Sequence, residues 1–260
     1  MKKFVALLLA VLMVASLCAC GQKGTGSDLQ TVTKGKLIMS TNAEFAPYEY
    51  VADDGKGFQG TGYEGIDIEI AYALAQKLGL ELVVDNMDFD AALSAVQTGK
   101  SDMVAAGVTV TPDRLNAMSF TDSYANGVQV VIVKEDSDIK SIDDLQGKKI
   151  GTQRGTTGFL YCSDDFGDDN VIGFDDGATA VQNLKAGKID CVVIDNVPAQ
   201  EYVKANPGLT ILDTEYANED YAIGIAKDNT ALQEALNKAL AELKADGTIQ
   251  SIIDKYIPAK

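Results

Sequence analysis

Short apolar runs alternate with amphipathic helical stretches along most of the chain, and this alternation constrains the fold more than any other feature. Residues 66–78 place Ile66 and Ile70 at helical spacing and are followed by Gly79, a helix stop signal. Residues 128–133 read VQVVIV, which is typical of a strand covered on both faces. Strands that alternate with helices predict an α/β sandwich.

Two sets of such elements follow one another, at 36–122 and 128–212, and indicate two lobes. We predict strands at residues 36–41, 80–84, 103–106, 128–133, 149–152, 171–174, 189–194 and 221–226. We predict helices at residues 66–78, 89–98, 141–145, 178–186, 230–246 and 248–256, and one that begins at Thr157. Residues 42–50 are predicted to be a loop held by Pro47, and the Gly- and Asp-rich residues 51–64 a surface turn.

The N-terminus predicts export. Lys2 and Lys3 precede an apolar run that ends in Leu-Cys-Ala-Cys at 17–20, the arrangement of a secretory signal. This ending resembles the bacterial lipobox, whose last cysteine is acylated and becomes the new N-terminus. We expect a lipoprotein signal peptide at 1–19, lipid attachment (palmitate) at Cys20 and a tether at 20–35. An ordinary cleaved signal peptide or an N-terminal anchor helix is the alternative.

The charge balance excludes some partners. Asp and Glu number 38 against 22 Lys and Arg, giving a formal net charge of −16 at pH 7. Nucleic acid and anionic lipid repel such a chain, so we expect no nucleic-acid partner. An acidic surface suits an exported soluble body that must stay dispersed.

The chain contains no histidine. Ser-His-Asp and Cys-His catalysis are therefore excluded, and the usual nitrogen ligand of zinc is missing. We expect neither a cofactor nor a metal site. Cys191 lies in an apolar run, so we expect Cys162 and Cys191 to be buried free thiols, with a disulfide between them as the alternative.

Several segments carry a family resemblance. They are NAEFAPYEY (42–50), GIDIEIAYALAQKL (65–78), MDF (87–89), AGVTVTPDR (106–114), SFTDSY (119–124), RGTTG (154–158), VIDNVP (193–198) and DGTIQSIIDKY (246–256). In this order and spacing they resemble the polar amino-acid binding proteins of ABC importers, bacterial solute-binding protein family 3, over residues 34–258. The resemblance implies a type II periplasmic-binding-protein clamp with a ligand cleft between two α/β lobes. Lobe 1 would comprise 36–124 plus 218–260, and lobe 2 would comprise 125–217.

The same resemblance implies a function. The chain would be the extracytoplasmic substrate-binding component of an ABC importer, binding a free polar L-amino acid. It would deliver this ligand to permease subunits powered by a cytoplasmic ATPase. We expect a monomer, held by its lipid anchor on the outer face of the bacterial cytoplasmic membrane.

A free amino acid offers a carboxylate and an ammonium, so a closed cleft needs paired charges. The resemblance implies that Arg114 binds the carboxylate with two parallel hydrogen bonds, and that Asp195 accepts from the ammonium. It also places Thr157 at a helix N-terminus that favours anions. The other residues carried over as ligand-binding are Asn42, Phe45, Phe89, Gly107, Thr109, Gln153 and Thr156. Taken alone, Arg114 could equally be a solvated charge and Asp195 a turn or helix cap.

The ligand's side chain is less well defined. Positions that set specificity in relatives correspond to Asn42, Glu44, Gln153 and Arg154. Phe45 and Phe89 would be apolar plates on either side of the ligand side chain. Glu44, Asp88 and Asp90 supply negative charge that suits arginine or lysine, or they merely join the acidic surface. Glutamine, glutamate and cystine therefore stay open.

The competing class is enzymatic. A few relatives of this fold are dehydratases of small carboxylic acids, and Glu44 would be the acid or base here. Arg114 together with Asp195 argues against this, because a substrate without an amino group has no use for Asp195. We therefore expect no catalytic residues and no enzyme activity.

Overall fold

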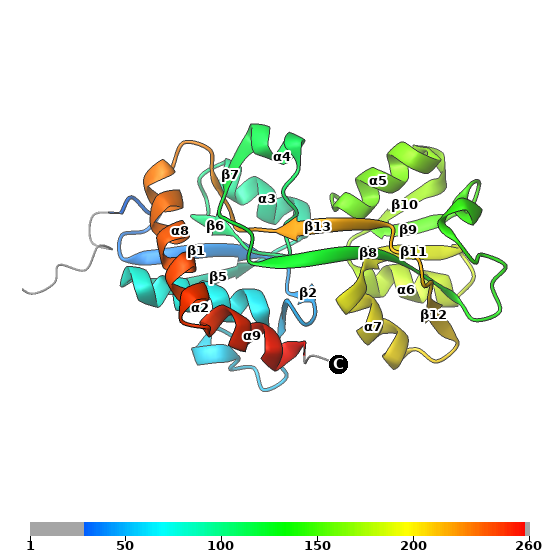
Figure 1. The fold of residues 1–260 in the computed structure, drawn as a ribbon, viewed down its shortest axis with the longest axis horizontal. Helices are drawn as coiled ribbons and strands as arrows, with labels where there is room; N and C mark the ends of the chain where they lie inside the picture. The colour runs from blue at the N-terminus through cyan, green and yellow to red at the C-terminus, as the bar shows by residue number, and fades with distance from the viewer. Residues whose placement is uncertain (1–28, 258–260) are drawn as a thin grey trace, which may run out of the picture.

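The computed structural model describes residues 29–257 as two α/β lobes that lie side by side (Figure 1). In the first lobe the sheet order is β5-β1-β6-β14-β7, namely β5 (Glu81–Asn86), β1 (Lys36–Thr41), β6 (Met103–Val104), β14 (Gly224–Ala226) and β7 (Met118–Phe120). In the second lobe it is β10-β9-β11-β8-β12, namely β10 (Val171–Phe174), β9 (Ile150–Gln153), β11 (Cys191–Asp195), β8 (Ala125–Lys134) and β12 (Leu209–Ile211). A further strand, β13 (Ala217–Tyr221), also pairs with β8. The predicted α/β class is therefore confirmed.

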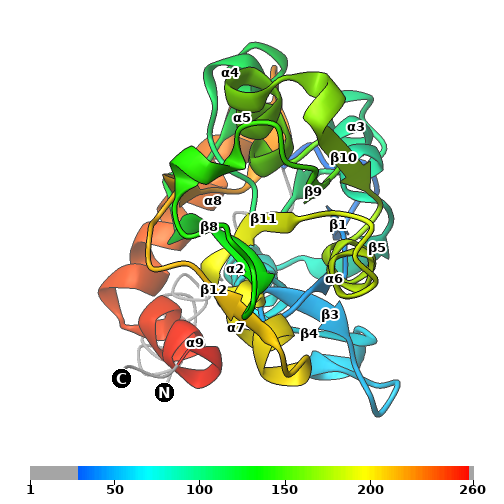
Figure 2. The ribbon, with the colours of Figure 1, turned by 90° about the vertical axis from the view of Figure 1, so that its right-hand side faces the viewer.

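Helices cover both faces of each sheet. The first lobe carries α2 (Ile66–Leu78), α3 (Phe89–Gln97), α4 (Pro112–Ala117), α8 (Thr230–Ala245) and α9 (Thr248–Tyr256). The second carries α5 (Thr157–Phe166), α6 (Gly177–Lys185) and α7 (Asn196–Ala205). Figure 2 shows α5 on one side of the second sheet and α6 and α7 on the other. Alternate residues of β8 divide accordingly: Val130 and Ile132 pack with α6 and α7, whereas Val131 and Val133 pack with Cys162 of α5.

The short elements are three 3-10 helices and one small sheet among the described residues. They are η2 (Phe58–Gly60), η3 (Ile142–Leu145), η4 (Asp168–Asn170) and the sheet of β2 (Glu44–Phe45), β3 (Glu49–Val51) and β4 (Tyr63–Glu64). The predicted loop at 42–50 and surface turn at 51–64 are thus partly wrong, because both contain paired strands.

One predicted strand is two strands. Residues 221–226 read YAIGIA, an unbroken apolar run that predicts a single element. In the structure β13 ends at Tyr221 in the second sheet and β14 begins at Gly224 in the first. Residues 221–225 are buried and Ala226 is partly buried, because the chain passes from one sheet to the other inside the protein.

Some elements were not predicted. They are β7, β12, α4, α7, η4 and β13, of which only Tyr221 falls in a predicted strand. Only Pro198 and Ala199 of α7 are buried, so its sequence shows no apolar stripe at helical spacing. The α4 helix is too short, at six residues, to show a period.

Strands β8 and β13 join the two lobes. They pair antiparallel, with Ala125 opposite Tyr221 and Gln129 opposite Ala217, and they run lengthwise between the lobes in Figure 1. At the first-lobe end, Val110 N donates to Asp220 O (3.1 Å). The predicted lobe division assigns most of β13 to lobe 1, yet the strand pairs with β8 along its whole length. The exact division stays a prediction.

The predicted signal peptide at 1–19 and Cys20 lie outside the described residues, as does most of the tether. The end of the tether contacts the first lobe, because Val32 N donates to Asp102 Oδ1 (2.7 Å). Within residues 29–257 no helix has the length and apolar character needed to cross a bilayer. Cys162 and Cys191 are buried free thiols, as predicted.

A close backbone approach joins the small sheet to α2. Gly65, which precedes α2, has φ +127°, and a Cβ there would lie 2.2 Å from Tyr48 O. On the same side, Asp67 N donates to Tyr48 O (2.9 Å). This approach holds the start of β3, including Glu49, directly against the first turn of α2.

Gly65→Ala is expected to lower the free energy of unfolding by about 2–4 kcal/mol, because it adds a backbone clash to the cost of a positive φ. Urea denaturation followed by circular dichroism measures the loss. Gly79→Ala is the control, since Gly79 also has a positive φ (+68°) but nothing within 4 Å of an added Cβ; about 1 kcal/mol is expected there. Equal losses would contradict the close approach.

Candidate functional site

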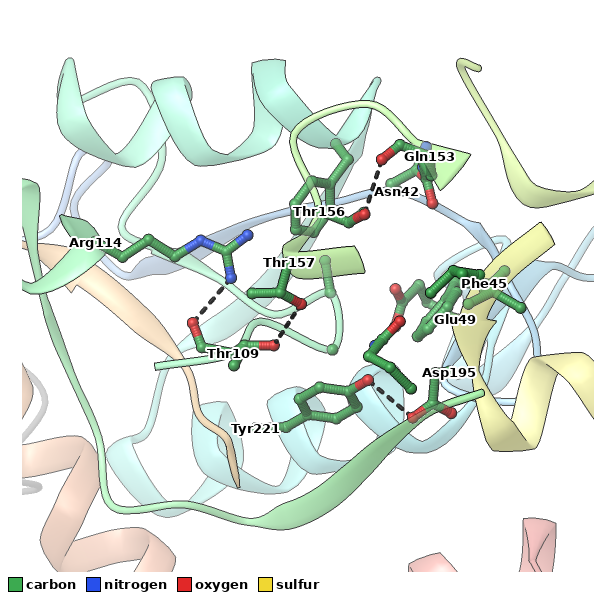
Figure 3. A pocket seen from close by; sticks show the side chains of 16 residues that line it. Asn42, Phe45, Glu49, Thr109, Arg114, Gln153, Thr156, Thr157, Asp195 and Tyr221 are labelled. Carbon is green, nitrogen blue, oxygen red and sulfur yellow. Dashed lines mark hydrogen bonds between the residues drawn. The ribbon is translucent and has the colours of Figure 1, made fainter. Parts of the chain in front are cut away.

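A pocket lies between the two lobes, and 16 residues line it (Figure 3). About 460 Å³ of it is free of atoms, part of this being open to solvent. The lining residues are Asn42, Phe45, Glu49, Phe89, Ala106, Gly107, Thr109, Arg114, Gln129, Gln153, Thr156, Thr157, Val193, Ile194, Asp195 and Tyr221. All the residues predicted to bind ligand are among them, so the structure brings together side chains from both lobes.

The two further specificity candidates, Glu44 and Arg154, do not line this pocket. Both are exposed, and Arg154 forms an ion pair with Asp175. Burial, followed by the charges of Asp176, Asp88 and Asp175, raises the pKa of Glu44. Glu44 thus belongs to an acidic rim, and its role in specificity stays a prediction.

The lobes are closed over the pocket. Hydrogen bonds that cross between them run from Gln153 Nε2 to Asn42 Oδ1 (2.9 Å), from Arg114 Nη2 to Gly155 O (3.1 Å) and between the hydroxyls of Thr109 and Thr157 (3.4 Å). Each of these bonds requires both lobes, so opening the cleft breaks them.

Arg114 supplies the positive charge of the pocket. Thr111 caps α4 by accepting from Arg114 N (3.2 Å), which fixes the start of the side chain. Its Nη1 donates to Thr109 O (2.8 Å), and the guanidinium lies 5.5 Å from the centre of the Phe89 ring. The side chain is 9% exposed, and no carboxylate of residues 29–257 lies within ion-pair distance of it. A buried cation without an anion is costly, so this end of the pocket favours an anionic group.

Asp195 supplies a negative charge at the opposite side of the pocket (Figure 3). It ends β11 and caps α7, since its Oδ1 accepts from Val197 N (2.9 Å). Its Oδ2 accepts from Val128 N and from the Tyr221 hydroxyl, each at 3.0 Å. Burial raises the pKa of Asp195 to about 6, while these three hydrogen bonds lower it. The side chain is therefore both a helix cap and a pocket wall, and it is tied to both connecting strands, β8 and β13.

The N-terminus of α5 faces the same space. Thr156 caps the helix by accepting from Phe159 N (3.3 Å), and its hydroxyl donates to Gln153 O (2.7 Å). Thr157 is the first helical residue and is buried. Free N–H groups and the helix dipole make such an end a site for anions.

Glu49 lines the pocket and was not predicted. Its side chain is 0% exposed, and neither carboxyl oxygen has a hydrogen-bond partner. Burial first, and then Asp67, raise the pKa of Glu49 well above its usual value. Sequence reasoning missed it because an acid in a proline-containing loop usually points to solvent.

Gln129 and Tyr221 were missed for another reason. They lie on β8 and β13 and reach the pocket only because these strands join the lobes. Gln129 Nε2 donates to Glu219 Oε2 (2.9 Å). Nothing in the linear sequence marks either residue.

Both the sequence and the fold match those of known proteins. Residues 37–259 match the model of the bacterial extracellular solute-binding proteins, family 3. The arginine-binding extracellular protein ArtP of Bacillus subtilis (strain 168) is 34% identical, over 98% of both chains. An ancestral arginine-binding protein bound to arginine superposes with a TM-score of 0.78 at 40% identity, over 86% of this chain and 99% of the other.

A second ancestral structure is also similar to this chain. It is an ancestral arginine-binding protein bound to glutamine, with a TM-score of 0.80 at 39% identity, over 87% of this chain and 100% of the other. These likenesses confirm the predicted fold, a two-lobed type II clamp.

Tyr221→Phe is expected to push the pKa of Asp195 further up from about 6, because the variant removes a hydrogen bond to the charged form. Carbon-13 NMR titration of the unliganded protein follows this carboxyl directly. Tyr216→Phe is the control, since the Tyr216 hydroxyl donates to Asp165 instead. If the pKa of Asp195 is the same in Tyr221→Phe as in the parent protein, the hydrogen bond from the Tyr221 hydroxyl to Asp195 is ruled out.

Proposed function

The chain belongs to the bacterial extracellular solute-binding proteins of family 3, and we propose that it is the extracytoplasmic substrate-binding component of an ABC importer. It takes up a free polar L-amino acid in the pocket between the lobes, closes on it and delivers it to permease subunits driven by a cytoplasmic ATPase. The names of the relatives, arginine-binding extracellular proteins among them, support this proposal.

The observation that carries the proposal is the placement of two buried opposite charges across one pocket. Arg114 and Asp195 are 9% and 1% exposed, and Figure 3 shows them on opposite sides. The α-carboxylate of an amino acid binds Arg114 and the amide groups at the start of α5. The α-ammonium donates to Asp195. A zwitterion thereby satisfies both charges, which neither a simple acid nor a simple amine does.

Glu49 indicates the class of side chain. A buried carboxyl group without partners is costly unless a cation pairs with it. A guanidinium offers two parallel donors to such a group. Phe45 and Phe89 also line the pocket and flank the aliphatic part of the ligand. We therefore propose a basic amino acid, with arginine as the first candidate.

In the proposed function, ligand binding closes the two lobes. The ligand contacts both lobes, so it favours the closed state by interactions that the open state lacks. Inverting a 99:1 preference for the open state takes about 5.5 kcal/mol of differential binding. The Arg114 and Asp195 pairs, added to the cross-lobe bonds of Gln153 and Thr109, are the source of this free energy.

Export and anchoring belong to the same proposal. The Leu-Cys-Ala-Cys sequence at 17–20 supports cleavage after residue 19 and acylation of Cys20, with the protein held as a monomer on the outer face of the cytoplasmic membrane. The dehydratase alternative finds no support: Glu44 does not line the pocket, and the relatives described above are named as binding proteins.

A thermal-shift screen of residues 29–260 against the common amino acids, ornithine, citrulline and cystine tests the proposed function. Arginine is expected to give the largest rise in melting temperature, because only a basic ligand pairs with Glu49. At 100 times its Kd a ligand stabilises the protein by about 2.7 kcal/mol. If no amino acid shifts the melting temperature, the proposed function is wrong.

Arg114→Ala is expected to weaken arginine binding by about 2–5 kcal/mol, roughly 30- to 4,000-fold in Kd, because the ligand carboxylate loses its buried partner. Isothermal titration calorimetry measures the loss, and circular dichroism checks that the unliganded variant melts near the parent temperature. The control is Arg154→Ala, which removes an exposed rim charge outside the pocket and should change Kd less than threefold. Near-parent affinity in Arg114→Ala refutes the assignment.

A further inference from the structure

Glu49 does not stand alone in the wall of the pocket. Asp67, in the first turn of α2, is 1% exposed, and its Oδ1, like both oxygens of Glu49, has no hydrogen-bond partner outside this pair. The backbone approach at Gly65 holds these two residues together, since a Cβ at Gly65 would lie 2.9 Å from the Cα of Glu49. A side-chain hydrogen bond between the two residues raises the pKa of Glu49 and lowers that of Asp67. The two carboxyl groups thus form a buried pair that reaches the ligand space through Glu49, which lines the pocket.

The other carboxyl oxygen of Asp67 accepts two hydrogen bonds. Its Oδ2 accepts from Gly107 N (2.9 Å) and from the Tyr124 hydroxyl (2.7 Å). Both bonds favour the ionised form of this carboxyl group. Asp67 is thus the member of the pair that keeps its negative charge, and Glu49 is the member that faces it.

The surroundings offer no positive charge to the pair. The titratable groups around it are the buried phenols of Tyr48 and Tyr124 and, from β11 and β13, Asp195 and the Tyr221 phenol, which packs against Tyr48. No lysine or arginine within residues 29–257 forms an ion pair with Glu49 or Asp67, and Arg114 lies at the far side of the pocket (Figure 3). Two adjacent carboxylates in such a place cannot both be ionised. Burial raises the pKa of Asp67 to about 6 and that of Glu49 well above its usual value.

We propose that Glu49 and Asp67 share one proton in the empty pocket and release it when the cationic head of the ligand side chain binds. The O–H bond of Glu49 breaks, the proton passes to water, and the carboxylate accepts from the arriving guanidinium. Binding is therefore an exchange of one cation for another, and Asp67 is the positioning residue that keeps the proton on Glu49. This inference rests on the proposed function, namely a basic amino acid as ligand.

The exchange predicts how pH affects selectivity. A ligand of the same shape with a neutral head, such as citrulline, meets the protonated pair and displaces no proton. At pH values below the pKa of Glu49, the ratio of the affinity for arginine to the affinity for citrulline therefore rises by up to about tenfold per pH unit. Asp195 contributes equally to both ligands, because both carry an α-ammonium.

The amino-acid composition limits which groups can release protons on ligand binding. The chain contains no histidine, so no side chain of ordinary pKa titrates near pH 7. Burial raises the pKa of both thiols, Cys162 to about 12. Protons released on binding near pH 7.5 therefore come from perturbed carboxyl groups, and Asp195, with a pKa of about 6, is already ionised there.

Calorimetric titration of residues 29–260 with arginine at pH 7.5, in buffers of different ionisation enthalpy, counts the protons. Between half a proton and one proton released per arginine is expected, and none with citrulline or glutamine. In Asp67→Asn the amide oxygen still accepts from Gly107 and Tyr124, and its NH₂ group donates to Glu49. The variant removes the charge of Asp67, which after burial is the second cause of the raised Glu49 pKa, so the release is expected to fall while arginine still binds. Glu234→Gln, a change at an exposed position of α8, should leave the count unaltered.

Each outcome decides one point. Arginine binding without proton release in the parent protein overturns the exchange and leaves the proposed function standing. An undiminished release in Asp67→Asn shows that the proton comes from elsewhere and overturns the pair. If Asp67→Asn does not fold, the pH dependence of arginine against citrulline in the parent protein decides alone, and equal slopes overturn the proposal. A parent protein that binds no arginine refutes the proposed ligand instead.

Discussion

Uncompensated buried charge is the constraint on which the rest of the structure depends. Arg114 and Asp195 face one pocket from different lobes, and neither pairs with an opposite charge of the protein within residues 29–257. Both charges are costly to bury alone. In the proposed function a zwitterionic ligand pairs with both at once, so the charges that destabilise the closed, empty state stabilise the closed, liganded one. The proposal thereby couples ligand binding to lobe closure.

Hydrogen bonds link the pocket to β8 and β13, the two strands that connect the lobes. Asp195 accepts from Val128 N of β8 and from the Tyr221 hydroxyl of β13, so the proposed partner of the ammonium is bonded to both strands that connect the lobes. Gln153 and Asn42 join the lobes at another part of the pocket wall. A ligand in the pocket therefore lies against the connecting strands and against a hydrogen bond between the lobes.

Much of this was predictable because its causes are local. The period of apolar residues in 66–78 is set by one face of one helix, and Gly79, with its positive φ, ends that helix as expected. The pocket residues of the matched motifs came together as predicted, since family motifs carry tertiary information. The errors have different causes. The run 221–226 was read as one strand because its division between two sheets depends on partners distant in sequence. The α7 helix was missed because only two of its residues are buried, and the strands within 42–64 were missed because each has only two or three residues.

The sequence by itself determined the α/β class, the acidic character, the absence of histidine chemistry and ten of the residues that line the pocket, because composition, period and motif spacing are properties of the chain alone. Only the tertiary structure decided that Glu49 is buried, unpartnered and set against Asp67. The same is true of Gln129 and Tyr221, which reach the pocket on the crossing strands. A carboxyl group's solvation depends on what packs around it, and here the surrounding atoms come from α2 and from the approach that Gly65 permits.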